Sequence, residues 1–155
     1  MNKYGKMITK SEGETVKVAK ELANKLIKKK SKTAVIIALK GELGAGKTTF
    51  IRGFSKVLGV REKILSPTFV LIHKHKLSYK PNWSDGSHRA LYHIDAYRLN
   101  SAKELEKLGV KEIFSGPENI VLIEWADRVE KIIPKNAIWV HMDHISKNKR
   151  KILIK

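Results

Sequence analysis

The chain has no cysteine among its 155 residues. Disulfide bonds and thiolate metal sites are therefore excluded, and the composition fits a reducing compartment. Long apolar runs are also missing. The longest, residues 34–39, is far too short to cross a bilayer, and the N-terminal residues contain no apolar signal segment. We therefore expect a soluble, cytoplasmic protein with no membrane partner.

Acidic residues are few relative to basic ones. The 15 Asp and Glu residues against 32 Lys and Arg give a formal net charge of +17 at pH 7. A basic surface binds phosphate backbones by releasing counterions, so a nucleic acid is a candidate partner. Arginine, which recognises phosphates and bases through two parallel hydrogen bonds, is scarce, and lysine supplies most of the charge. The lysine excess equally fits the codon bias of an AT-rich genome, so both explanations stay open.

Apolar spacing along the chain predicts alternating helices and strands. A capping pattern at Ser11 precedes a helical stripe that extends to residue 27, and a second one at Ser101 opens a short helix that should end near Gly109. Strands are predicted at residues 33–39, 68–73, 90–94 and 119–123. The polar stretch 74–89 is predicted to be a long loop or hairpin, and residues 137–145 and 149–154 a closing antiparallel hairpin.

One octapeptide carries the clearest functional signal. Residues 41–48 read GELGAGKT, the G-x-x-x-x-G-K-[ST] pattern of a phosphate-binding loop, between a predicted strand and a predicted helix. Glycines let backbone N–H groups turn inward onto phosphate oxygens, Lys47 reaches the outer phosphates, and Thr48 offers a hydroxyl to Mg²⁺. The residues predicted to hold the nucleotide are Ser11, Gly41, Glu42, Leu43, Gly44, Ala45, Gly46, Lys47, Thr48 and Thr49.

Length and composition limit the chain to one such domain. A hydrophobic content of 42% over 155 residues supports one core and is too small for two comfortable domains. We therefore expect residues 1–155 to form a single α/β P-loop NTPase domain. Its central sheet should be mainly parallel and flanked by helices, with the antiparallel hairpin at the C-terminal end.

Two acids follow predicted strands and are candidates for binding the metal. Glu124 comes directly after four apolar residues, and Asp95 follows a more mixed strand. Carboxylates at the carboxyl ends of parallel strands face the bound phosphates in this fold class. His93 is expected to be a structural or supporting histidine rather than a ligand, because no His or Cys lies at matching ligand spacing. Trp125 could pack in the core, shield the site from water or face a partner, and packing in the core is the favoured alternative.

Other nucleotide-binding classes fit less well. The loop lacks the third glycine of the dinucleotide pattern G-x-G-x-x-G, and the chain has no Asn-Lys-x-Asp guanine motif. A small P-loop kinase is the main alternative, although neither an arginine-rich lid nor an acceptor pocket is evident. A nucleic-acid-binding module without enzymatic activity would leave the phosphate loop unexplained.

Five motifs occur together and in order: GELGAGKTTF at 41–50, SPTF at 66–69, YHIDAYRL at 92–99, ELE followed by LG within 104–109, and IEW at 123–125. In this combination the chain resembles the bacterial TsaE (YjeE) family. These are small ATPases required for making threonylcarbamoyladenosine beside the anticodon of tRNAs that read ANN codons. The resemblance covers nearly the whole chain.

The resemblance implies a P-loop fold that binds MgATP through residues 41–49 and hydrolyses it to drive or reset a complex of the proteins TsaB and TsaD. It implies a switch near the γ-phosphate at residues 66–69, which adds Ser66, Pro67 and Thr68 to the nucleotide-binding residues. It further implies that Asp95 and Glu124 bind the metal with Thr48 and act in hydrolysis beside Lys47. The threonylcarbamoyl transfer itself belongs to TsaD, and tRNA would be met directly or through the complex.

Overall fold

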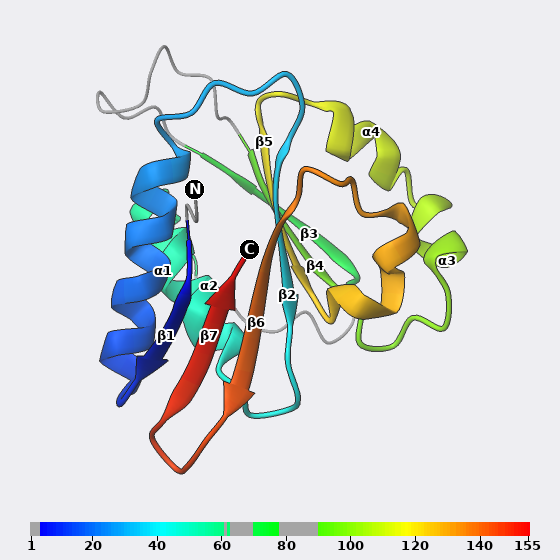
Figure 1. The fold of residues 1–155 in the computed structure, drawn as a ribbon. Helices are drawn as coiled ribbons and strands as arrows, with labels where there is room; N and C mark the ends of the chain where they lie inside the picture. The colour runs from blue at the N-terminus through cyan, green and yellow to red at the C-terminus, as the bar shows by residue number, and fades with distance from the viewer. Residues whose placement is uncertain (1–3, 61, 63–69, 78–89) are drawn as a thin grey trace.

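The computed structural model describes residues 4–60, 62, 70–77 and 90–155, which build one seven-stranded sheet with helices on both faces (Figure 1). The strand order across the sheet is β1-β7-β6-β2-β5-β4-β3. The strands are β1 (Lys6–Thr9), β2 (Val35–Lys40), β3 (Ile72–Lys76), β4 (Ala90–Asp95), β5 (Asn119–Glu124), β6 (Ile138–His144) and β7 (Arg150–Ile154).

The centre of the sheet is parallel. β6, β2, β5 and β4 run in the same direction, whereas β1, β7 and β3 pair antiparallel at the two edges. All six residues of β5 and the first five of β2 are buried, which explains their continuous apolar sequences. Because the carboxyl ends of parallel strands meet at one edge, Leu39, Asp95 and Glu124 come to neighbouring positions there. This confirms the predicted α/β class with a mainly parallel centre.

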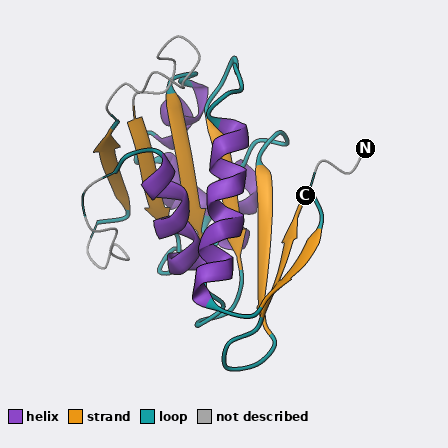
Figure 2. Ribbon diagram, turned by 90° about the vertical axis from the view of Figure 1, so that its left-hand side faces the viewer, coloured by secondary structure: helices purple, strands orange, loops and turns teal. Residues whose placement is uncertain are grey.

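Two helical layers cover the sheet. α1 (Glu12–Leu26) and α2 (Lys47–Val57) lie side by side on one face, as Figure 2 shows from that side. The other face carries α3 (Ala102–Glu106), α4 (Val110–Ser115) and the 3₁₀ segment η2 (Ala126–Ile132). Each layer encloses its own set of buried apolar side chains, including Phe50 and Leu122 under α1 and α2, and Leu105 and Ile123 on the opposite face.

The start of α1 is fixed by its predicted cap. The hydroxyl of Ser11 accepts a hydrogen bond from the backbone N–H of Glu14 at 3.2 Å. The carboxylate of Glu14 accepts from the N–H of Lys10 at 2.6 Å rather than from that of Ser11, so the reciprocal bond falls one residue earlier than in a capping box. A buried hydrogen bond of 2.9 Å between the hydroxyls of Thr9 and Thr15 joins β1 to the same helix.

Several predicted boundaries were wrong. β3 extends to Lys76 and pairs antiparallel with β4, so residues 74–76 agree with the predicted hairpin and not with the predicted loop, while residues 68–69 and 78–89 lie outside the described residues. The helix after Ser101 ends at Glu106, and a separate α4 follows Gly109. β1 and η2 were not predicted. β1 has only four residues, and β3 has lysine or histidine at four of its five positions, so neither shows a clear local apolar alternation.

Candidate functional site

The glycine-rich loop connects the carboxyl end of β2 to the first turn of α2. Gly44 and Gly46 have φ angles of 80° and 98°, left-handed values that favour glycine. At Gly41 a side chain would collide with the backbone carbonyl oxygen of Met142 on β6. The loop therefore has its glycines where the backbone turns and where it crosses the neighbouring strand.

Lys47 is buried at the base of this loop. Its Nζ donates hydrogen bonds to the carbonyl oxygens of Gly41 and, at 3.0 Å, of Glu42, and it lies 4.0 Å from the centre of the Trp125 ring. Burial lowers the pKa of Lys47, and the negative charges of Glu124 and Glu42 oppose this effect. The site therefore holds a positive charge that has lost part of its solvation, an environment that favours an anionic ligand.

Glu124 at the end of β5 contacts two side chains with its two oxygens. Oε2 lies 2.7 Å from Nε2 of His93, and Oε1 accepts a hydrogen bond from the Thr48 hydroxyl at 3.3 Å. Both Glu124 and His93 are buried. Because a carboxylate only accepts, a neutral His93 ring must carry its proton on Nε2. His93 therefore lies behind Glu124 and orients it, which agrees with the supporting role predicted for this histidine.

Asp95 is the register partner of Glu124 on the adjacent strand β4. Its Oδ1 accepts the backbone N–H of Tyr97 at 3.0 Å. The two predicted acids thus lie next to each other at the same edge of the sheet. Glu124 accepts a hydrogen bond directly from the phosphate-loop threonine, Thr48.

A cleft of about 420 Å³ opens beside the loop. It brings together the predicted residues Ser11, Glu124 and the loop from Leu43 to Thr49, whereas Gly41, Glu42 and Asp95 do not line it. The predicted switch residues Ser66, Pro67 and Thr68 lie outside the described residues. The lining residues that were not predicted are Glu12, Trp125, Lys147, Asn148 and Arg150.

Three of the unpredicted residues come from the β6–β7 hairpin: Lys147 and Asn148 lie in its turn, and Arg150 is the first residue of β7. The Arg150 guanidinium donates to the carbonyls of Ser146 at 2.8 Å and Lys149 at 3.0 Å, which fixes the shape of this turn. The turn reaches the cleft because β6 pairs with β2, the strand that leads into the phosphate loop. The sequence predicts a polar hairpin turn at these residues. It does not predict the strand order that brings the turn to the cleft, because that order depends on pairing between distant segments.

Trp125 both packs against the core and borders the site, so the favoured alternative, packing in the core, describes only part of its surroundings. Its backbone has a φ of 56°, a left-handed value that is uncommon for a bulky residue. The ring packs partly against the buried cluster under η2, but it also lines the cleft, where Lys47 lies over it. Tyr97 at 5.0 Å and Arg128 at 5.5 Å surround the same ring. The position of Trp125 directly after Glu124 is the sequence feature that could have predicted its place at the cleft.

The oxygen donors beside the loop suit a hard divalent cation. The Thr48 hydroxyl and the Glu124 carboxylate lie within hydrogen-bond distance of each other, and Mg²⁺ prefers such oxygens together with water and phosphate. The donor set therefore fits the predicted metal through Thr48 and Glu124, with Asp95 one strand away.

The family model for the threonylcarbamoyl adenosine biosynthesis protein TsaE matches residues 9–152. The chain belongs to the TsaE family. It is 38% identical over 141 residues to a relative from Rickettsia conorii, which covers 90% of this chain and 71% of the relative. A relative from Haemophilus influenzae is 33% identical over 129 residues, 83% of this chain and 75% of the relative. Both are named tRNA threonylcarbamoyladenosine biosynthesis protein TsaE.

A solved structure has the same fold as this TsaE-family chain. The crystal structure of YdiB from Bacillus subtilis superposes with a TM-score of 0.68 at 31% identity, covering 96% of this chain and 82% of YdiB. The family resemblance inferred from the five motifs is thereby confirmed, as is the predicted P-loop fold. No helix within the described ranges is long and apolar enough to cross a membrane.

Proposed function

We propose that this TsaE-family chain binds MgATP in the cleft beside residues 41–49 and hydrolyses it. The energy would drive or reset a TsaB–TsaD complex during threonylcarbamoyl modification of the adenosine beside the tRNA anticodon. The observation that supports this most directly is the meeting of Lys47, Thr48 and Glu124 at one end of a 420 Å³ cleft. These are a phosphate-binding cation, a metal-binding hydroxyl and a carboxylate.

Each residue has a distinct part in this proposal. Lys47 would bind the outer phosphate oxygens, while the carbonyls of Gly41 and Glu42 keep its amine at the base of the loop. Thr48 and Glu124 would hold Mg²⁺, which supplies charge neutralisation at the phosphates. His93 keeps the Glu124 carboxylate in one orientation through the 2.7 Å hydrogen bond. Asp95 would position the attacking water from the neighbouring strand.

Among the cleft-lining residues that the structure describes, the one arginine is not available for the transition state. Arg150 lines the cleft, but its guanidinium is bonded to carbonyls of its own turn. Arginine supplied by a partner typically accelerates phosphoryl transfer in enzymes of this class by several orders of magnitude. We therefore expect slow hydrolysis by the isolated chain and stimulation when a TsaB–TsaD complex completes the site.

The test is a reconstituted modification reaction with purified TsaB, TsaD and tRNA. Thr48→Ala removes the hydroxyl that ties the metal to the loop, so it should abolish multiple turnovers per TsaD while nucleotide binding persists. Thr33→Ala, at an exposed position before β2, is the matched control and should behave as wild type.

Two outcomes would contradict the proposal. One is full multiple-turnover modification without this chain or with the Thr48→Ala variant. The other is transfer of the γ-phosphate to a member of a panel of small acceptors in place of hydrolysis, which would favour the small-kinase alternative.

A further inference from the structure

A second group of metal-ligating side chains lies on the edge strand β3 and in the chain that follows α2, with His73 the register partner of His93. Glu62, His73 and His75 each offer one ligand atom, and these three atoms lie within 4.8 Å of one another. Nδ1 of His75 is 2.7 Å from Oε2 of Glu62. The rings of His73 and His75 are stacked, with centres 4.4 Å apart and an angle of 19° between their planes.

Strand geometry explains why the two histidines converge. Residues two apart on a strand point to the same face of the sheet. His75 is the register partner of Leu91, which belongs to the buried cluster under α1 and α2, so both histidines face that layer. The intervening Lys74 points to the opposite face, where its amine lies over the Tyr92 ring. The lysines of β3 therefore do not place positive charge beside the cluster.

The three ligands differ in how far they are buried. His75 is buried, with 3% of its side chain exposed, whereas His73 and Glu62 are exposed. One ligand is therefore held firmly by packing, and two can adjust and admit an ion from solvent. Neither histidine contributes to the ATPase proposed above, which uses His93 on β4.

We propose that Glu62, His73 and His75 form a binding site for one transition-metal ion, best suited to Zn²⁺. Two imidazole nitrogens and one carboxylate oxygen are ligands that Zn²⁺ prefers, and a water molecule completes the usual four positions. Mg²⁺ is a poor competitor, because it prefers oxygen ligands in octahedral geometry. This ligand set therefore differs in chemistry from the oxygen donors of Thr48 and Glu124.

The bound ion would connect two segments that are separate in the sequence. Glu62 follows α2, and His73 and His75 belong to the edge strand β3. An ion that binds these ligands only when they are held together stabilises the folded state over the unfolded one. Zn²⁺ should therefore raise the melting temperature of the protein, an effect independent of nucleotide.

The site can be tested with the untagged full chain after treatment with a chelator. Co²⁺ is titrated at pH 7.5 in excess Mg²⁺, its d–d absorption reports the ligand environment, and Zn²⁺ is then added to displace it. We expect one ion per chain in the wild type. We also expect the same binding in His144→Ala, a control that removes an exposed histidine on β6.

His73→Ala and Glu62→Gln are the test variants, because both positions are exposed and their loss should leave the fold intact. Losing a residue that only supports a metal ligand costs about 10–100-fold in affinity, so loss of a ligand should cost at least that. The rise in melting temperature with Zn²⁺ should disappear in the same variants. Unchanged affinity in His73→Ala, or no ion bound by the wild type, would overturn the site. Either result leaves the ATPase proposal untouched, because no readout depends on hydrolysis.

Discussion

The carboxylate of Glu124 divides its two oxygens between different partners. One oxygen accepts a hydrogen bond from the Thr48 hydroxyl, and the other lies against buried His93. A buried carboxylate held from behind by a histidine has little rotational freedom. The residue can therefore present a fixed oxygen to a metal ion at the start of α2, which is what positioning a hydrolytic site requires.

Replacing this carboxylate by an amide tests its role. We expect Glu124→Gln to abolish ATP hydrolysis in the partner complex while the protein stays folded, because a neutral amide is similar in shape but is a poor metal ligand. Asp95→Asn should have the same effect on hydrolysis. Turnover measured by phosphate release, with circular dichroism for the fold, checks both. Glu130→Gln in η2 is the control, and wild-type turnover in either test variant would make that acid structural only.

Lys47 is the residue on which nucleotide affinity should depend most. A charge-assisted phosphate contact contributes about 1.5–3 kcal/mol, so Lys47→Ala should weaken MgATP binding by roughly 10–150-fold. Titration calorimetry gives the dissociation constants directly. The control Lys56→Ala removes an exposed lysine of the same helix and should leave affinity unchanged. Equal affinity in Lys47→Ala would refute the assignment of the loop.

The sequence predicted the site where its residues are consecutive or follow a strand. Loop residues 43–49 and Glu124 meet at the cleft as expected, because a strand, a tight turn and a helix place them by local geometry, whereas Gly41, Glu42 and Asp95 do not line it. The contribution of Lys147 and Arg150 depends on β6 pairing with β2, a contact between distant segments. The spacing and composition of residues do not reveal which distant strands pair.

The contact between helices α1 and α2 depends on a small residue. A Cβ atom added at Gly53 would lie 3.0 Å from the Cα and the carbonyl oxygen of Val16, and 3.2 Å from the Cβ of Ala19. Backbone atoms of α1 cannot move aside without shifting the whole helix. Gly53 therefore sets how closely the two helices approach on this face of the sheet (Figure 2).

A pair of glycine substitutions separates this packing effect from helix propensity. Gly53→Ala should lower the free energy of unfolding by about 1–2 kcal/mol, because overpacking exceeds the gain in propensity. Gly13→Ala in α1 meets only the Ser11 hydroxyl at 3.7 Å, so it should raise stability by about 0.5 kcal/mol. Urea denaturation measures both. A stabilised Gly53→Ala variant would show that the helices can separate at little cost.

Elements with strong apolar sequences were predictable, and the polar ones were not. The runs that became β2 and β5 are buried on both faces, so their composition alone indicates a central strand. β1 has only four residues and its partner β7 lies far along the chain, whereas β3 has lysine or histidine at four of its five positions. Their local sequences fit an exposed loop equally well, which is why β1 was missed and β3 was displaced.

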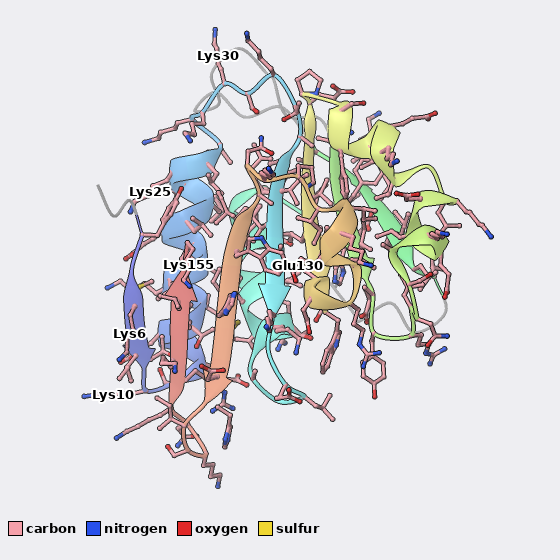
Figure 3. The ribbon with its side chains drawn as sticks, turned by 45° about the vertical axis from the view of Figure 1, so that its right-hand side comes forward. Lys6, Lys10, Lys25, Lys30, Glu130 and Lys155 are labelled. Carbon is pink, nitrogen blue, oxygen red and sulfur yellow. The ribbon has the colours of Figure 1, made fainter. Side chains whose placement is uncertain are left out.

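For the molecule as a whole, the charge of +17 is distributed over the surface. Figure 3 shows Lys6, Lys10, Lys25 and Lys30 around β1 and α1, and Lys155 beyond β7, all of them exposed. The region is therefore rich in cations without the arginine pairs that recognise particular bases. Such a surface can attract a polyanion, and codon bias could produce the same surface without selection for binding.

Salt dependence distinguishes these two explanations of the charge. If the lysines serve tRNA binding, the logarithm of affinity should fall steeply and linearly with the logarithm of salt concentration. The affinity for tRNA should also exceed that for an unrelated RNA of equal length. Filter binding over a salt series measures both quantities. Weak association of equal strength with the two RNAs would favour the compositional explanation.

The position of β7 has a consequence for how the protein is made. β1 pairs with β7, and the turn that leads into β7 lines the cleft beside the phosphate loop. A ribosome synthesises β1 and the loop early, whereas β7 and the turn that leads into it follow the other six strands in sequence. The nascent chain therefore carries an unpaired first strand and an open-sided cleft through most of its synthesis. Tight capture of a ligand in the cleft therefore depends on a segment that is synthesised long after the phosphate loop.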